Sequence, residues 1–259
     1  MNNIQTPDLS NKQKQIHLLF YKFRFLTISH FMKLLNHKSH TKILEWLNDL
    51  VGIGYLGRNY ERKFSPDPGS YFLKQPGVKV LRNIEDVDKN SLRILNREHK
   101  KKKRFISHCF LVTEIYIHYL KLAQDDKVHF KTRIEMDSDK FLFEPKPDAY
   151  IAIEESGQVI KRYFLEVFDP GTFKTKVYAR IQQYLNYSED GEWQRQTGHD
   201  FPEVLVVCPD LAMKHKVFRF LKAVLNEDSY YEVTFHLATK EAIKYHGVGI
   251  GVWQDVKPV

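Results

Sequence analysis

Apolar residues recur at helical spacing in three successive segments near the start of the chain. In the first segment they are Ile16, Leu19, Phe20 and Phe23. This spacing places them on one face of an amphipathic helix, and Ser10 is suited to cap its N-terminus. The same pattern follows two further candidate N-caps, Thr27 and Ser39. We therefore predict three short helices, over residues 10–23, 27–35 and 39–50.

Glycine and proline end the helical pattern after the third segment. Residues 55–60 and 70–74 are short strand-like runs, and the loop between them, at 65–69, is rich in proline and glycine. Such a loop between two strand-like runs predicts a β-hairpin. Three helices followed by a hairpin is the element order of a winged helix-turn-helix domain. We place this domain at residues 1–84.

The rest of the chain alternates between helix and strand patterns. This order predicts an α/β domain with a mixed sheet over residues 105–259, so that the whole chain is α+β with two domains. Residues 85–104 would then form a basic linker. Helices are predicted over 106–123, 172–187 and 212–225, and strands at 127–134, 140–144, 148–153, 162–168, 204–208, 231–237 and 248–254.

Charge is distributed unevenly between the two predicted domains. The chain carries a net charge of +8. Residues 1–104 hold 21 Lys and Arg against 9 Asp and Glu, whereas residues 105–259 hold 19 against 23. A basic half indicates a polyanionic partner, and nucleic acid is the commonest one. A basic face that is merely solvated is the alternative.

The basic residues gather where a winged helix would contact DNA. The recognition helix enters the major groove by its N-terminal end, and cationic and hydroxyl side chains there and in the wing suit phosphate contacts. A winged helix that docks a protein is the alternative, and the basic run of the linker is either a phosphate clamp or simply solvated. The candidates are Lys38, Ser39, His40, Thr41 and Lys42 in the helix, Arg58, Arg62 and Lys63 in the wing, and Lys100, Lys101, Lys102, Lys103 and Arg104 in the linker.

Two acidic residues stand in apolar strand patterns of the second half. They are Asp148, after Pro147, and Glu166 within Phe164-Leu165-Glu166-Val167. A buried carboxylate is costly unless it is paired, hydrogen-bonded or bound to a metal. Carboxylates on adjacent strands can converge on Mg²⁺ or Mn²⁺, which prefer oxygen ligands. The alternative is structural, an Asp in a turn and a Glu in a salt bridge.

The pattern around these acids resembles that of PD-(D/E)xK nucleases. In those enzymes Pro-Asp is followed by a hairpin and then by an acid, one residue and a lysine. Asp148 and Glu166 match the two acids, whereas Phe168 stands at the lysine position. The resemblance implies a metal site at these acids. Further candidates are Glu114 on the preceding helix, Lys176, Arg180, Gln183 and Tyr187 on one face of the following helix, where Gln183 and Tyr187 form a Gln-x-x-x-Tyr pair, and Lys146 and Asp169 nearby.

Several short motifs spread over nearly the full length of the chain carry a resemblance to one family. They are Tyr71-Phe72-Leu73-Lys74-Gln75-Pro76-Gly77, residues 108–114, Pro147-Asp148-Ala149-Tyr150, Phe164-Leu165-Glu166-Val167, Gly171-Thr172, Tyr184 and Trp253. With these residues the chain is similar to the replication-relaxation family of plasmids, phages and integrative elements. Where that family usually carries Glu-x-Asp and a basic residue before Gly-Thr, this chain reads Glu166-Val167-Phe168-Asp169-Pro170.

This resemblance implies a DNA-binding protein that acts in replication or DNA relaxation of a mobile element, and leaves open whether it nicks DNA with a divalent metal. One alternative is a non-catalytic replication initiator or transcriptional regulator with a degenerate nuclease fold. Another is a scaffold that docks replication proteins through the acidic half. Double-stranded DNA is the expected partner, and a homodimer and contacts with replication proteins stay open.

The remaining features of the sequence concern location and other chemistries. Cys109 and Cys208 form no Cys-x-x-Cys pair, which fits a reducing cytoplasm and disfavours a disulfide framework or zinc ribbon. The chain shows no apolar signal core and no uninterrupted apolar run of about 18 residues, so we expect no membrane span. Gly-x-Ser-x-Gly, His-Glu-x-x-His and phosphate-loop motifs are absent.

Overall fold

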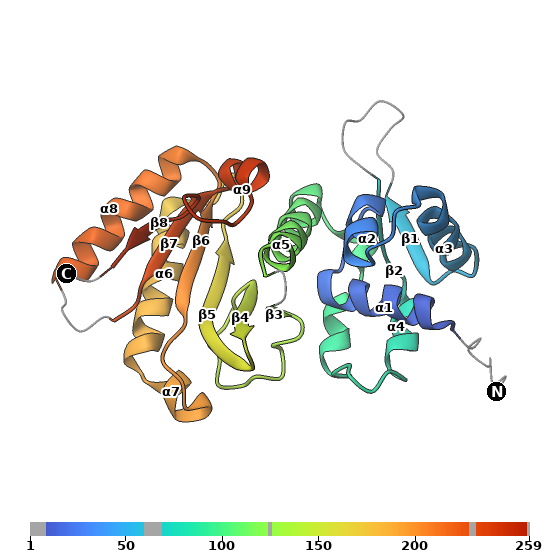
Figure 1. Ribbon diagram of the computed structural model, residues 1–259, viewed down its shortest axis with the longest axis horizontal. Helices are drawn as coiled ribbons and strands as arrows, with labels where there is room; N and C mark the ends of the chain where they lie inside the picture. The colour runs from blue at the N-terminus through green and yellow to red at the C-terminus, as the bar shows by residue number, and fades with distance from the viewer. Residues whose placement is uncertain (1–8, 60–68, 124–125, 228–231, 258–259) are drawn as a thin grey trace. The chain divides into compact units, whose positions relative to one another are not determined.

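The computed structural model describes residues 9–59, 69–123, 126–227 and 232–257. The chain divides into two compact units, Met1–Glu114 and Ile115–Val259 (Figure 1). The boundary falls within the long helix α5, which runs over Lys103–Leu122. Of the helices in the described ranges, none is long and apolar enough to span a membrane.

The first unit begins with the three predicted helices, and their predicted N-caps are confirmed. The Ser10 hydroxyl accepts a hydrogen bond from the backbone N–H of Gln13, whose side chain accepts one from the N–H of Ser10. Thr27 caps the second helix and Ser39 the third. Because these caps satisfy N–H groups that lack a helical partner, they define where each helix starts. The helices are α1 (Asn11–Phe23), α2 (Ile28–Leu34) and α3 (His40–Gly52).

An antiparallel two-stranded sheet follows, as predicted. Leu56 pairs with Leu73, and Leu26, before α2, forms an isolated bridge with Tyr71. The helix after the sheet starts at Gln75, because Pro76 is compatible with the first turn of a helix. The elements are β1 (Leu56–Asn59), β2 (Ser70–Leu73), α4 (Gln75–Leu81) and two 3-10 helices, η1 (Ser91–Leu95) and η2 (Glu98–Lys100).

The segment predicted as a linker contributes to the first unit. Leu92 and Leu95 are buried, and Glu98 pairs with Arg24 at the end of α1, with a shortest distance of 2.7 Å. Two short 3-10 helices give no extended periodicity, which is why the sequence pattern did not reveal this packing. The two compact units divide after Glu114, whereas the predicted domains are separated by a linker at residues 85–104. The predicted domain boundaries stay a prediction.

The second unit contains a mixed six-stranded sheet in the order β3-β4-β5-β6-β7-β8. The first three strands are antiparallel, β5, β6 and β7 are parallel, and β8 is antiparallel to β7. The α+β class and the mixed sheet are thus confirmed. The strands are β3 (Lys127–Thr132), β4 (Ala149–Glu155), β5 (Gln158–Val167), β6 (Glu203–Cys208), β7 (Phe235–Thr239) and β8 (Gln254–Val256).

Helices cover both faces of this sheet. Phe164, Val204 and Phe235 point to one face and belong to a large apolar core with α6 and α8. On α5, Tyr119 is buried, and Tyr116 contacts Phe130 of β3 with ring centroids 4.9 Å apart. The helices of the second unit are α6 (Lys174–Glu189), α7 (Glu192–Thr197), α8 (Leu211–Glu227) and α9 (Lys240–His246), besides the end of α5.

The prediction of a strand at residues 140–144 is wrong, because this segment forms turns. The buried Lys146 ammonium donates hydrogen bonds to the carbonyl groups of Asp139 and Leu142. These carbonyls then serve a turn rather than a strand ladder. The strand predicted at 248–254 overlaps β8 only at Gln254, because residues 248–252 form turns and bends. Helices α7 and α9 had no counterpart in the sequence prediction.

His17 on α1 makes the stability of the first unit sensitive to pH. It is fully buried, its Nδ1 lies 2.8 Å from the Gln13 carbonyl oxygen, and its Nε2 has no hydrogen-bond partner among the described residues. Burial lowers the pKa of its imidazole from the usual 6.5. Below about pH 6.5 the unfolded chain therefore binds a proton that the folded chain excludes, and the free energy of unfolding falls as pH decreases.

We expect His17→Leu to remove this contribution, since leucine does not titrate. Urea unfolding of wild type and variant between pH 5 and pH 8 measures it, with the exposed His246→Gln as control. The stability difference between wild type and His17→Leu should change with pH by more than the difference between wild type and His246→Gln, because His17 is buried whereas His246 is exposed. Equal pH slopes for wild type and His17→Leu would show that His17 does not act in this way.

Candidate functional site

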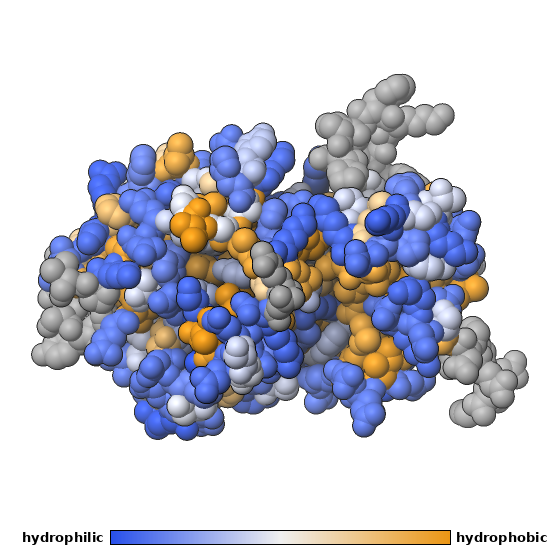
Figure 2. All heavy atoms as spheres, in the orientation of Figure 1, coloured by the Kyte–Doolittle hydropathy of each residue, from blue (hydrophilic) through white to orange (hydrophobic). Residues whose placement is uncertain are grey.

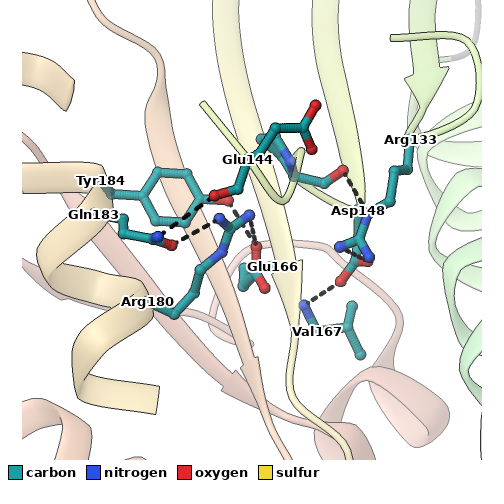
Figure 3. Close-up of polar contacts among 9 residues, drawn as sticks. Arg133, Glu144, Asp148, Glu166, Val167, Arg180, Gln183 and Tyr184 are labelled. Carbon is teal, nitrogen blue, oxygen red and sulfur yellow. Dashed lines mark hydrogen bonds and ion pairs between the residues drawn. The ribbon is translucent and has the colours of Figure 1, made fainter. Parts of the chain in front are cut away.

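The two predicted acids lie beside each other at one end of the β4–β5 hairpin. Asp148 immediately precedes β4, and its N–H donates to the Leu165 carbonyl at 2.9 Å. Glu166 follows Leu165 in β5 and lies near the carboxyl end of that strand. Asp148 is 5% and Glu166 7% exposed. The hairpin register therefore brings together two carboxylates that are 18 residues apart in the sequence (Figure 3).

Asp148 is held by a side chain and by the backbone of β5. Its Oδ1 accepts a hydrogen bond from Arg133 Nη2, and its Oδ2 accepts one from the N–H of Val167, both at 2.8 Å. Arg133 follows β3 directly, and about half of its side chain is exposed. The backbone contact ties the Asp148 carboxylate to the strand that carries Glu166, and the contact with Arg133 balances its charge.

Glu166 faces α6, from which two side chains reach it. Its Oε2 accepts hydrogen bonds from Arg180 Nη2 and from the Tyr184 hydroxyl, each at 2.8 Å. Arg180 also donates to Gln183 Oε1 at 3.1 Å. The guanidinium lies over the ring of Phe143, 4.7 Å from its centroid. Arg180 is thus fixed by charge, hydrogen bonding and an aromatic face together.

The electrostatics of this cluster are dominated by burial. Burial raises the pKa of Glu166, and the charge of Asp148 raises it further, whereas Arg180 and Arg133 act in the opposite direction. Burial and the Glu166 charge also raise the pKa of Tyr184, so that its hydroxyl stays protonated and donates to the carboxylate. Two carboxylates and two guanidinium groups leave the cluster formally neutral.

The sequence did not predict that Arg133 would contact Asp148 or that Tyr184 would contact Glu166. Arg133 lies just after a strand and carries no motif of its own. Tyr184 is one turn after Arg180, so its place on the same helix face was readable, but Tyr187 was selected as the tyrosine of the site. In the structure the Tyr187 hydroxyl donates to the Phe141 carbonyl at 3.0 Å. Glu166 is contacted by Tyr184.

The other predicted residues of the second unit occupy varied places. Gln183 joins the cluster through Arg180, and its Nε2 reaches the Glu144 carbonyl at 3.5 Å. Lys176 is exposed on α6, one turn before Arg180. Phe168, at the expected lysine position, is buried in the apolar core. Asp169 forms an ion pair with Lys240 at 2.8 Å.

Glu114 belongs to the first unit, where its carboxylate lies 3.9 Å from His30 Nε2 of α2. It was predicted as a further acid of the metal site on the strength of its place before the sheet. Its assignment to that site stays a prediction.

The donor set of the cluster fits a hard divalent cation in chemistry. Carboxylate oxygens are the ligands that Mg²⁺ and Mn²⁺ prefer, and Mg²⁺ is often held by one or two carboxylates plus water. The mutual repulsion that raises the Glu166 pKa is also what a cation would relieve. Within the described part of the chain, no group of three or more His, Cys, Asp or Glu side chains is placed to hold a metal.

The first unit presents a separate basic surface at the start of α3. Lys38, His40, Thr41 and Lys42 are exposed. Ser39 caps the helix, with its hydroxyl accepting from the N–H of Lys42 at 3.2 Å. Lys42 pairs with Glu45 at 2.7 Å. The start of α3 is therefore open to a ligand, with part of its charge shared with Glu45.

The other predicted DNA contacts of the first unit differ in their accessibility. Arg58 of β1 donates to Asn48 Oδ1 at 2.8 Å and to the Tyr71 hydroxyl at 2.7 Å, so that it links α3 to the two strands. Arg62 and Lys63 lie outside the described residues. Exposed positions in the basic run are Lys100, Lys102, Lys103 and Arg104, whereas Lys101 is half-buried over the Phe105 ring.

Removing Arg180 should destabilise the second unit strongly. In Arg180→Met the buried Glu166 loses its main cationic partner, and breaking a buried pair from one side typically costs about 3–5 kcal/mol. The loss of stability in Arg180→Met should be smaller at pH 5 than at pH 7. Without Arg180 the pKa of Glu166 rises further, so at pH 5 its carboxylate is more readily protonated and its unpaired negative charge is removed. Urea unfolding at both pH values measures this.

Arg195→Met is the matched control, because Arg195 forms an ion pair with Glu192 at the surface. Exposed pairs contribute little to stability, so this variant should unfold close to wild type at both pH values. If Arg180→Met were as mild as Arg195→Met, the buried pair would not stabilise the fold in the way described.

The chain is similar in sequence to a known protein family. The sequence model of the replication-relaxation family matches residues 18–204. This range starts within α1 and ends in β6, so it includes the basic surface of α3 and the whole carboxylate cluster. No curated relative matches the chain. Because the family match covers well over half of the sequence, the chain belongs to the replication-relaxation family.

Proposed function

We propose that this protein binds duplex DNA through a winged helix in its first unit and acts in the replication or relaxation of a mobile element. The observation that carries the proposal is the exposed basic surface at the N-terminal end of α3. Recognition helices enter the major groove by this end. Membership of the replication-relaxation family supports the same role.

The packing of α3 supports its use as a recognition helix. Ile43, Leu47 and Leu50 are fully buried and hold the helix against the unit. Thr41 and Lys42 are exposed in its first turn, and Lys38 is exposed just before its N-cap, Ser39. A rigid helix end with cationic and hydroxyl groups suits phosphate and base-edge contacts, since its position does not have to be ordered on binding.

Reversing charge at this helix end should weaken duplex binding and its dependence on salt. Each phosphate contact contributes about 0.9 to the slope of log K against log salt concentration. We expect the double variant Lys38→Glu, Lys42→Glu to bind a 30-base-pair duplex more weakly and with a slope reduced by about 2. Fluorescence anisotropy between 50 and 300 mM NaCl measures both.

Lys89→Glu is the control, because Lys89 is an exposed lysine of the same unit outside α3. It should leave most of the affinity intact. An unchanged salt slope in the double variant would argue that α3 does not contact DNA, and would favour a protein partner for the winged helix.

A second function, metal-dependent nicking of DNA, is favoured by the carboxylate pair of the second unit. Burial and repulsion from the Asp148 carboxylate raise the pKa of Glu166. A divalent cation bound between the two carboxylates would offset this repulsion. Asp148 and Glu166 would hold Mg²⁺ or Mn²⁺. The ion, when bound, would activate water and stabilise charge on a phosphate.

The surrounding residues would have distinct parts in this chemistry. Tyr184 and the Val167 N–H orient the two carboxylates through hydrogen bonds. Arg180, with Phe168 at the usual lysine position, is the cation closest to Glu166 and could balance charge on a scissile phosphate. A non-catalytic protein, in which the arginines serve only to neutralise the two acids, is the competing outcome.

Direct metal binding separates these two outcomes. Titration of Mn²⁺ followed by electron paramagnetic resonance should show one site in wild type that is lost in Asp148→Asn and Glu166→Gln. Nicking of supercoiled plasmid with Mg²⁺ or Mn²⁺ should be lost in the same variants. The exposed Glu155→Gln on β4 should change neither. Absence of both metal binding and nicking in wild type would leave the non-catalytic role.

A further inference from the structure

The carboxyl ends of three parallel strands form one edge of the sheet in the second unit. Val167 of β5 pairs with Val207 of β6, and Cys208 pairs with Thr239 of β7. The segments that follow these strands therefore lie side by side. Two of them expose apolar side chains, with Phe173 72% and Leu211 60% exposed. Around α8 and α9, Figure 2 shows apolar areas that are small and bordered by hydrophilic residues.

Phe173 is displayed on a well-defined turn. Its carbonyl oxygen accepts hydrogen bonds from the N–H groups of Lys176 and Val177, at 3.0 and 3.2 Å, and it is the N-cap residue of α6. In the preceding turn, Thr172 donates to the Asp169 carbonyl at 2.8 Å, and Asp169 is tied to Lys240. The exposed ring thus projects from a backbone that is already ordered, which lowers the entropic cost of using it for binding.

Cationic side chains follow the two helices that begin at this edge. Tyr178 of α6 donates to the Lys216 carbonyl of α8 at 3.3 Å and stacks on Phe220, with ring centroids 4.2 Å apart. Helices α6 and α8 therefore pack side by side here. Exposed cations on them are Lys174, Lys176, Lys216 and Arg219.

On these two helices acids occur only at the last residue, since α6 ends at Glu189 and α8 at Glu227. Residues 174–188 and 211–226 contain neither Asp nor Glu, although residues 115–259 as a whole hold 22 acids against 19 Lys and Arg. Lys174, Lys176, Lys216 and Arg219 form no ion pair with any residue that the structure describes. An acidic part of the chain thus concentrates unpaired positive charge beside an exposed aromatic ring.

We propose that this edge binds single-stranded DNA, with a base stacked on Phe173 and phosphates held by Lys174, Lys176 and Lys216. An unpaired base offers a planar face to an aromatic side chain, and the cations track the backbone. A duplex hides these base faces. An acidic peptide would use the cations but leave the ring without a planar partner. The choice of DNA rests on the proposed function.

The position of this edge relates it to the carboxylate cluster. Phe173 is seven residues before Arg180 on α6, which is about 10 Å along a helix. Glu166, the partner of Arg180, is in the same strand, β5, that leads into the Phe173 turn. A single strand held on Phe173 would therefore lie near the two acids. This placement gives the second unit a preference for the unpaired strand of a replication or relaxation intermediate.

Binding of a single-stranded oligonucleotide to the full chain tests the proposal. The probe is a fluorescein-labelled 30-nucleotide strand of mixed sequence, and the comparison is its duplex, both at 150 mM NaCl. We expect Phe173→Ala and the double variant Lys174→Glu, Lys176→Glu to raise the Kd for the single strand about tenfold, as loss of one stacked base does. The Kd for the duplex should stay within about twofold. Phe173→Trp should bind normally and show added tryptophan quenching.

Ile160→Ala and Lys161→Glu are matched controls, since they change an exposed apolar residue and an exposed cation at the opposite end of β5. Neither should affect the single strand. Circular dichroism melting confirms folding of each variant. An unchanged Kd in Phe173→Ala, equal losses for strand and duplex, or vesicles with phosphatidylserine competing as well as DNA would each overturn the proposal.

The duplex data keep this inference separate from the proposed function. Lys38→Glu, Lys42→Glu should lose duplex affinity and keep the effect of Phe173→Ala on the single strand. Loss of duplex binding alone thus concerns α3. Failure of the Phe173 variants to affect the single strand, with duplex binding by α3 intact, concerns only the edge of the sheet.

Discussion

The buried pairing of Glu166 with Arg180 is the interaction on which the second unit depends. A carboxylate in the centre of a sheet is costly unless its charge is balanced and its oxygens are hydrogen-bonded. Arg180 and Tyr184 meet both needs from one helix, α6, and thereby set the position of α6 against β5. Arg133 and the Val167 N–H do the same for Asp148. The sheet can then keep two acids side by side in an apolar core.

This arrangement is compatible with both a stable fold and the proposed metal site. Acids that were only structural could be replaced by apolar residues, and acids that were fully exposed would have ordinary pKa values. Here burial and mutual repulsion raise the pKa of Glu166, while the arginines limit the rise. Binding of a cation or a phosphate, as proposed, would shift this balance, because either one would change the charge that the arginines face.

The two units have opposite charge but related chemistry. In the first, capped helices place cations at the start of α3, on a body fixed by buried side chains such as Ile43 and Leu47. In the second, cations gather on α6 and α8 although acids exceed basic residues in that part of the chain. Net charge alone therefore indicated a nucleic-acid partner for the first unit and concealed the basic surface of the second.

Much of the first unit could be read from the sequence, because its signals are local. Ser10, Thr27 and Ser39 cap helices whose apolar spacing is regular, and proline and glycine mark the loop between β1 and β2. The strands near Asp148 and Glu166 were also readable, since Tyr150 and Ile151 follow Asp148, and Phe164 and Val167 lie on either side of Glu166. Element types and their order follow from such short-range patterns.

What only the tertiary structure decided is which side chains meet. The pairing of Asp148 with Arg133 and the choice of Tyr184 over Tyr187 depend on strand register and on the rotation of α6, which sequence spacing does not specify. The buried Lys146 turned a predicted strand into turns for the same reason. The sequence by itself determined most of the helices and strands, and it singled out Asp148 and Glu166. Their partners, and the edge that displays Phe173, arise from contacts between residues distant in the chain.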